Sequence, residues 1–288
     1  MAKGDFHLHS TASDGVRSPS WVMETAYANG VQLLSLTDHD STEGLAEARE
    51  VAERRGLRLV PGIELSTDLG PSDVHLLAYG FDPSSEAIQS FLRWQREVRI
   101  GRVEKIVAIL RDEGAPIETS RVFEIAGEAS VGRPHVARAL VERGHVASVQ
   151  EAFDRWLADG KAAAVPRAKL SPQEAIDLIH REGGVVFSAH PVFIGRMYLE
   201  ALEQLAGWGL DGLEAYYKNW NEEQVTELVM LAGKLGIACS GGSDYHGLGN
   251  PDEIAIGHIP FPDTAVDRFV ALLEERCAVP FVTPKEAP

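Results

Sequence analysis

Two histidines lie one residue apart in the stretch DFHLHSTASDG, which covers residues 5–15. Because alternate side chains of a β-strand point to the same face, His7 and His9 would present two imidazole rings side by side. Asp14, five residues after His9, adds a carboxylate to the same stretch. Two imidazoles on one face form either a solvated polar edge or half of a metal site, and the pair alone leaves both interpretations open.

Histidines and carboxylates also interrupt the other short apolar runs of the chain. They stand at or near the ends of these runs: His39 in LTDHD, Glu64 in GIELS, His75 in VHLLAYGF, His190 in SAHP, and Asp244 and His246 in GGSDYH. A lone histidine beside an apolar run is more often a hydrogen-bonded structural residue. In a parallel β/α barrel, however, the carboxyl ends of the strands converge on one face, where active sites are found. Polar residues at the same end of so many strands therefore indicate a shared metal site.

The predicted ligands are imidazole nitrogens and carboxylate oxygens, with no thiolate. This donor set suits zinc, manganese or iron(II), and disfavours a purely oxygen-lined magnesium or calcium site. Three carboxylates, Asp14, Glu64 and Asp244, join the six histidines in this set. So many ligands exceed the coordination of one ion, so we expect two or three divalent ions with one carboxylate bridging two of them.

The elements that must position these ligands are short and apolar. Seven β-rich runs alternate with longer helical patterns, which is typical of an α/β fold: GDFHLH, QLLSLTDHD, LRLVPGIEL, VHLLAYGF, GGVVFSAHP, DGLEAYY and GIACSGGSD. The alternation favours βαβ units around a parallel sheet. Ser171 and Glu174 form a capping box that predicts a helix beginning at Pro172.

One long interval, between LLAYGF and GGVVFSAHP, contains no convincing strand. It has helical segments near 86–113, 133–143 and 148–158, and it is too long for a single crossover. We therefore predict a helical insertion over 99–165. Insertions that follow a strand end usually lie over the active-site face of a barrel, so we expect this one to cap the site.

Charge and composition limit the classes of partner and compartment. The chain has 27 Lys and Arg against 43 Asp and Glu, a formal net charge of −16. This acidity argues against long duplex nucleic acid as a partner, but allows a small phosphorylated substrate. The chain shows no bilayer-spanning run and no signal-peptide core, and its two cysteines provide no disulfide framework, so a cytoplasmic protein without a membrane partner is expected. The oligomeric state is left open.

The motifs HLHS, TDHD, SAHP and SDYH, with Glu64 and His75 between them, resemble the polymerase and histidinol phosphatase (PHP) family of metal-dependent phosphoesterases. The resemblance implies a distorted seven-stranded (β/α)7 TIM-like barrel, formed here by 1–98 and 166–288, with a trinuclear metal centre. It also implies a distribution of the ligands among three ions. The sets are His7, His9, Glu64 and Asp244 for the first ion, Glu64, His75 and His190 for the second, and Asp14, His39 and His246 for the third.

The segments GRPHVARALVERG and AFDRWLADGKAAAVPRAKLSPQEAI resemble the branch with nucleoside 3′,5′-bisphosphate phosphatases and a 5′-to-3′ RNA-trimming enzyme. The same branch shape includes a sugar cyclic-phosphate hydrolase. The implied reaction is attack of a metal-bridging hydroxide on phosphorus. The best single substrate is the 3′-phosphate of a nucleoside 3′,5′-bisphosphate, or short 5′-phosphorylated oligoribonucleotides. Two alternatives remain, a phosphoesterase for a sugar phosphate or ribose cyclic phosphate and a non-catalytic metal-binding barrel. Side-by-side kcat/KM on nucleotide and sugar panels would separate a nucleotide substrate from a sugar phosphate.

Several other polar residues are candidates for contact with the substrate. Arg133 and His135 in VGRPHVAR are the leading candidates to bind phosphate, and Lys169 and Arg196 come next. After SAHP the nucleotide enzymes tend to have a small residue, an arginine and a tyrosine, whereas this chain reads VFIGRMY, which displaces Arg196. Asp38 could orient His39 or take part in proton transfer.

Overall fold

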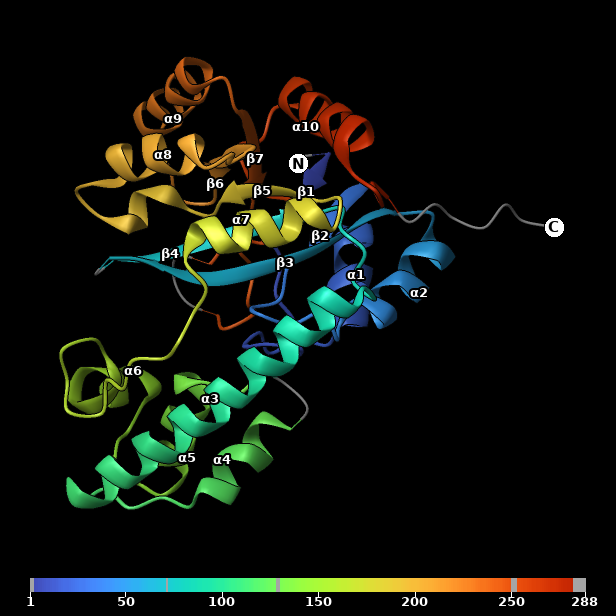
Figure 1. Ribbon diagram of the computed structural model, residues 1–288. Helices are drawn as coiled ribbons and strands as arrows, with labels where there is room; N and C mark the ends of the chain where they lie inside the picture. The colour runs from blue at the N-terminus through green and yellow to red at the C-terminus, as the bar shows by residue number, and fades with distance from the viewer. Residues whose placement is uncertain (1–2, 71, 128–129, 250–252, 282–288) are drawn as a thin grey trace. The chain divides into compact units, whose positions relative to one another are not determined.

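The computed structural model describes residues 3–70, 72–127, 130–249 and 253–281 (Figure 1). It divides the chain into two compact units. The first comprises Met1–Gln89 and Lys169–Pro288, and the second comprises Ser90–Ala168. The first unit contains all the strands that position the predicted ligands, and the second is helical in its described residues.

The first unit is built on a nearly closed seven-stranded barrel. Its strands are β1 (Gly4–Asp5), β2 (Leu33–Leu36), β3 (Arg58–Leu69), β4 (Ser72–Tyr79), β5 (Val185–Ser188), β6 (Gly212–Tyr217) and β7 (Ala238–Gly242). They pair in chain order from β1 to β7. The ends of the sheet meet where the Phe6 N–H donates to the Gly241 carbonyl at 3.1 Å. This α/β barrel confirms the predicted fold class.

Strand β4 departs from the parallel sheet that the alternation of runs favours. It is antiparallel to both neighbours, β3 and β5, while the other pairs of adjacent strands are parallel. The reason is the short link after Leu69, because a parallel crossover needs a dozen or more residues whereas a hairpin needs only a few. His75 pairs with Ser66 across this hairpin, so it comes from the first half of β4 and still lies beside the last half of β3.

Six helices accompany the strands of this unit: α1 (Pro19–Ala28), α2 (Leu45–Arg55), α7 (Pro172–Arg181), α8 (Tyr198–Gly207), α9 (Glu222–Leu235) and α10 (Asp263–Arg276). In Figure 1, α9 lies beside β6 and α10 beside β7. The predicted capping box is confirmed, because Ser171 accepts from the Glu174 N–H and Glu174 accepts from the Ser171 N–H. None of the helices in the described ranges combines the length and apolar character needed to cross a bilayer.

The seam between β1 and β7 depends on close backbone approach. The buried Asp5 carboxylate accepts the N–H groups of Ser243 at 2.9 Å and Gly257 at 2.8 Å. Beside it, a Cβ added to Gly242 would lie 2.1 Å from the His7 Cβ and 2.6 Å from the His7 nitrogen. The absence of a side chain at Gly242 therefore lets β7 come close enough to place His7 at the mouth of the barrel.

The second unit has its own apolar core. Its helices are α4 (Thr119–Ala126), α5 (Arg133–Glu142) and α6 (Val149–Ala152), with most of α3 (Glu86–Asp112) and one π-helical turn at Phe153–Leu157. Val107, Leu110, Val122 and Leu140 are buried among them. The helix α4 was not anticipated from the sequence. The expectation that this unit caps the active site stays a prediction.

Replacing Gly242 by alanine is expected to lower the free energy of unfolding by about 1–3 kcal/mol, because the new methyl group would collide with His7. Gly233 in α9 is the matched control, since a Cβ there meets nothing within 4 Å. Gly233→Ala should stabilise the protein by up to ~1 kcal/mol through higher helix propensity. Urea unfolding of both variants measures these effects, and equal stability of the two would contradict the close packing of the seam.

Candidate metal centre

The buried carboxylate of Glu64, on β3, lies at the centre of the predicted ligands. Five imidazole nitrogens surround it: His7 Nε2 at 3.1 Å, His9 Nε2 at 3.1 Å and His39 Nδ1 at 3.2 Å from Oε2, and His75 Nδ1 at 2.9 Å and His190 Nε2 at 3.0 Å from Oε1. Burial alone would raise the pKa of Glu64, but the surrounding histidines hold it well below its usual range. Glu64 is therefore an ionised carboxylate to which histidine side chains from four other chain segments converge.

The set expected for the first ion forms one of the tight groups of the structure. In this group, ligand atoms of His7, His9, Glu64 and Asp244 all lie within 4.8 Å of one another. Asp244 Oδ1 is 3.4 Å from His7 Nε2 and 3.2 Å from His9 Nε2. The geometry thus brings together the four side chains that the family resemblance assigned to one ion, with their donor atoms close to one another.

The set expected for the second ion gathers around the other oxygen of Glu64. Both His75 and His190 point a ring nitrogen at Oε1, and His39 joins Glu64 and His75 in a second group of ligand atoms within 4.8 Å. His190 has a backbone φ of 28°. A non-glycine residue with positive φ costs on the order of 1–3 kcal/mol, and such strain persists only where the surrounding structure enforces it.

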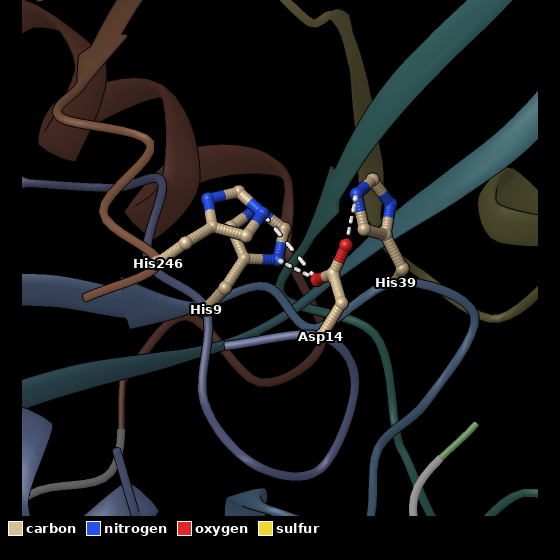
Figure 2. A group of neighbouring side chains, drawn as sticks. All are labelled: His9, Asp14, His39 and His246. Carbon is tan, nitrogen blue, oxygen red and sulfur yellow. Dashed lines mark ion pairs between the residues drawn. The ribbon is translucent and has the colours of Figure 1, made fainter. Parts of the chain in front are cut away.

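The set expected for the third ion is drawn in Figure 2. The Asp14 carboxylate lies between His39 on one side and the stacked rings of His9 and His246 on the other. Its Oδ1 is 3.3 Å from His246 Nε2 and 4.0 Å from His9 Nδ1, and its Oδ2 is 4.0 Å from His39 Nε2. His9 is the fourth member of this group, so its two ring nitrogens face two different groups.

The polar atoms of these groups fit divalent cations. His9 Nδ1 and Nε2 and His39 Nδ1 are buried, and although carboxylate oxygens lie nearby, none meets these described atoms in the geometry of a hydrogen bond. Buried polar atoms are usually partnered. Burial lowers the pKa of His9, but Asp244 and Glu64 outweigh it and raise the pKa to about 9, so this pocket favours a positive charge. For His39, burial dominates and lowers the pKa to about 3, which leaves its ring neutral with a free lone pair. The ligand role of these residues stays a prediction.

Asp38 holds the loop that leads to Asp14. Its carboxylate accepts the Ser10 N–H, the Ser10 hydroxyl and the Ser13 hydroxyl, each at 2.7 Å. Burial raises its pKa despite these hydrogen bonds. Asp38 is thus fully engaged with the segment between His9 and Asp14. The predicted role of Asp38 in orienting His39 or in proton transfer stays a prediction.

The predicted phosphate-binding residues fall in both units. In the barrel unit, Lys169 lies 2.7 Å from both Asp68 and Asp73, and Arg196 is exposed after the 3₁₀ turn at Pro191–Ile194. In the helical unit, Arg133 donates to the Leu157 carbonyl and pairs with Asp159, while His135 Nδ1 accepts the Gly132 N–H. These contacts tie Arg133 and His135 to the turns around them. A role for any of the four in substrate binding stays a prediction.

Sequence reasoning did not connect three residues of strand β6 and its end with the candidate ligands. Glu214 contacts His7, and Tyr217 and Lys218 contact Asp244. Glu214 stands in the apolar run DGLEAYY and is fully buried. A carboxylate within an apolar run signals a buried partner. The same signal identified Glu64.

Comparison with known proteins agrees with this geometry. Residues 5–158 match the family model described as "PHP domain". A protein of Haemophilus influenzae named "5'-3' exoribonuclease" is 34% identical over 85% of this chain and 90% of its own length. A protein of Chromobacterium violaceum named "3',5'-nucleoside bisphosphate phosphatase" is 34% identical over 86% of this chain and 89% of its own length.

Among the solved structures that resemble this chain, two cover nearly all of it. One, described as an amidohydrolase from Chromobacterium violaceum with bound sulfate and no metal, has a TM-score of 0.85 at 29% identity and covers 99% of both chains. The other, described as a putative metal-dependent phosphoesterase from Bifidobacterium adolescentis, has a TM-score of 0.82 at 31% identity over 93% of this chain and 95% of that one. With its family-model match, its relatives and its three groups of candidate ligands, this chain belongs to the PHP domain family.

Proposed function

We propose that this chain, a metal-dependent phosphoesterase of the PHP family, hydrolyses a small nucleotide-like phosphate ester, and that the best substrate is the 3′-phosphate of a nucleoside 3′,5′-bisphosphate. The chain is a hydrolase of phosphoric ester bonds. The observation that carries the proposal is the Glu64 carboxylate with five imidazoles around it, joined by Asp14, Asp244 and His246 in groups whose atoms fit divalent ions. Relatives named for a bisphosphate phosphatase and an exoribonuclease support the nucleotide-like substrate.

We assign two or three divalent ions, of manganese, iron or zinc, to these groups. Imidazole nitrogen and carboxylate oxygen are the donors that these metals accept. Bound there, the ions would supply an activated water and neutralise charge on the phosphoryl oxygens. Glu64 would serve two groups through its two oxygens, and His9 would serve two groups through its two ring nitrogens. The shared side chains hold the groups within one mouth of the barrel, as concerted attack and charge neutralisation require.

An exposed aromatic ring beside the candidate ligands supports a base in the substrate. The Phe193 side chain is 62% exposed, although its ring lies 5.4 Å from the His190 ring and 5.2 Å from the Trp220 ring. A planar base can stack on such a ring without breaking any hydrogen bond. Tyr217, by contrast, is buried and packs rather than stacks on a ligand. We therefore assign Phe193 to the base of the substrate.

Removal of the metal ions is expected to abolish phosphate release from adenosine 3′,5′-bisphosphate, and addition of Mn²⁺ should restore it. His9→Ala should lower kcat/KM by about 100-fold or more, because His9 belongs to two ligand groups. The matched control is His258→Ala, since His258 is exposed and belongs to none of the groups found among the described residues. Colorimetric phosphate release and metal content by mass spectrometry measure both effects. Metal-replete protein that releases no phosphate from a broad panel of phosphate esters would refute the proposed activity.

Phe193→Ala is expected to raise KM for nucleoside bisphosphates about tenfold, because stacking on an aromatic side chain is worth about 1–3 kcal/mol per base. The KM for a ribose phosphate without a base should not change. Met230→Ala, at a similarly exposed apolar residue on α9, is the control. Steady-state kinetics of both variants on the two substrates measures these changes in KM. Higher kcat/KM on sugar phosphates, with no effect of Phe193→Ala on any substrate, would favour a sugar-phosphate enzyme.

A further inference from the structure

Within the described residues, strand β6 differs from the other six strands because it supplies no candidate metal ligand. Candidate ligands come from or directly after the others: His7 and His9 after β1, His39 after β2, Glu64 on β3, His75 on β4, His190 after β5, and Asp244 and His246 after β7. Strand β6 lies between β5 and β7 in the sheet (Figure 1). It nevertheless carries the buried Glu214 and ends at the buried Tyr217, followed by Lys218.

Glu214 uses both carboxylate oxygens on the candidate ligands. Its Oε1 lies 2.9 Å from His7 Nδ1, and its Oε2 accepts the backbone N–H of His190 at 2.8 Å. A carboxylate oxygen in this position accepts a hydrogen bond, so the contact favours the proton of His7 on Nδ1. The lone pair of His7 is then on Nε2, the nitrogen that faces Glu64 and Asp244. Glu214 thereby sets which nitrogen of His7 is available to an ion.

Tyr217 and Lys218 hold the carboxylate of Asp244 in a similar way. The Tyr217 hydroxyl donates to Asp244 Oδ2 at 2.7 Å, and Lys218 Nζ lies 3.1 Å from the same oxygen. Lys218 also donates to the backbone carbonyl of Asp244 at 3.1 Å. The other oxygen, Oδ1, remains directed at His7 and His9. Oδ2 of Asp244 is therefore held by Tyr217 and Lys218, while Oδ1 faces the candidate ligands.

The same contacts reach two residues with unusual backbones. Among the described non-glycine residues only three have positive φ, and His190 at 28° and Asp244 at 47° are two of them. Glu214 accepts the N–H of the first, and Lys218 donates to the carbonyl of the second. Residues in this conformation need such contacts to remain there.

A bulge in β6 explains how Glu214 and Tyr217, three residues apart on one strand, can both contact the candidate ligands. Glu214 pairs with Ser240 of β7, but Tyr216 pairs with Gly241, so Ala215 is an extra residue. Alternation along a regular strand would place residues 214 and 217 on opposite faces, and the extra residue reverses this. Glu214 and Tyr217 consequently both point at the ligands. Tyr216 is turned away and stacks on Phe261, with ring centroids 5.0 Å apart.

We propose that β6 is a positioning strand: Glu214, Tyr217 and Lys218 bind no ion themselves but fix the orientation of His7, His190 and Asp244 for metal binding. This inference rests on the metal centre of the proposed function. It predicts that substitutions of these residues weaken metal affinity while the stability of the metal-free fold changes little.

The test compares Glu214→Gln, Tyr217→Phe and the control Tyr216→Phe in the chain of residues 1–288. Glutamine has one acceptor oxygen, so one of the two N–H donors would face an NH₂ group. Tyr217→Phe removes a single hydroxyl donor, and Tyr216→Phe removes a hydroxyl from the same strand on the other face. Calorimetric titration of chelator-treated protein with Mn²⁺ gives the affinity, and melting temperature with EDTA gives the stability of the metal-free fold.

We expect Glu214→Gln and Tyr217→Phe each to weaken Mn²⁺ binding by about 10- to 100-fold. The melting temperature in EDTA should stay near that of the wild type, and Tyr216→Phe should match the wild type in both measurements. Wild-type Mn²⁺ affinity in both site-facing variants would overturn the proposal, even if their activity fell. If Glu214→Gln does not fold, Tyr217→Phe decides alone. Failure of the wild type itself to bind Mn²⁺ or release phosphate would instead count against the proposed function.

Discussion

The ionised Glu64 carboxylate, buried in the barrel among five histidine nitrogens, is the interaction on which the rest of the site depends. A buried charge is costly unless it is paired or coordinated, so a structure that buries Glu64 must bring partners to it. Those partners lie on or after strands that are far apart in the sequence. The barrel satisfies the requirement because the strand ends that carry them meet at one mouth.

This requirement explains several local departures from regular structure. The antiparallel β4 brings His75 to Glu64 from the first half of a strand. His190 and Asp244 adopt positive φ values at the ends of β5 and β7. Gly242 lacks the side chain that would separate β7 from His7. Each of these features is unfavourable or unusual alone, and each places one donor atom in the cluster.

The distribution of charge follows the same logic. The chain has a net charge of −16, and lysines of the barrel unit already contact aspartates: Lys218 contacts the candidate ligand Asp244, and Lys169 contacts Asp68 and Asp73. The carboxylates of Asp14, Glu64, Asp244 and Glu214 therefore gather at the mouth, where the charge of Lys218 is already paired. Bound metal ions would reverse this sign locally and make the mouth attractive to a phosphate. An acidic protein can in this way act on an anionic substrate.

By itself the sequence determined the types of the candidate ligands and the apolar runs beside which they stand, because alternating apolar runs and capping boxes are local patterns. It also indicated seven strands and helical segments between the fourth and the fifth. Only the tertiary structure decided that His9 faces two groups and that Asp38 is engaged by Ser10 and Ser13. The inward direction of both Glu214 and Tyr217 was decided there too. These outcomes depend on strand register, on one bulge and on the antiparallel hairpin. Such features arise from pairing between distant segments, so no local pattern in the chain encodes them.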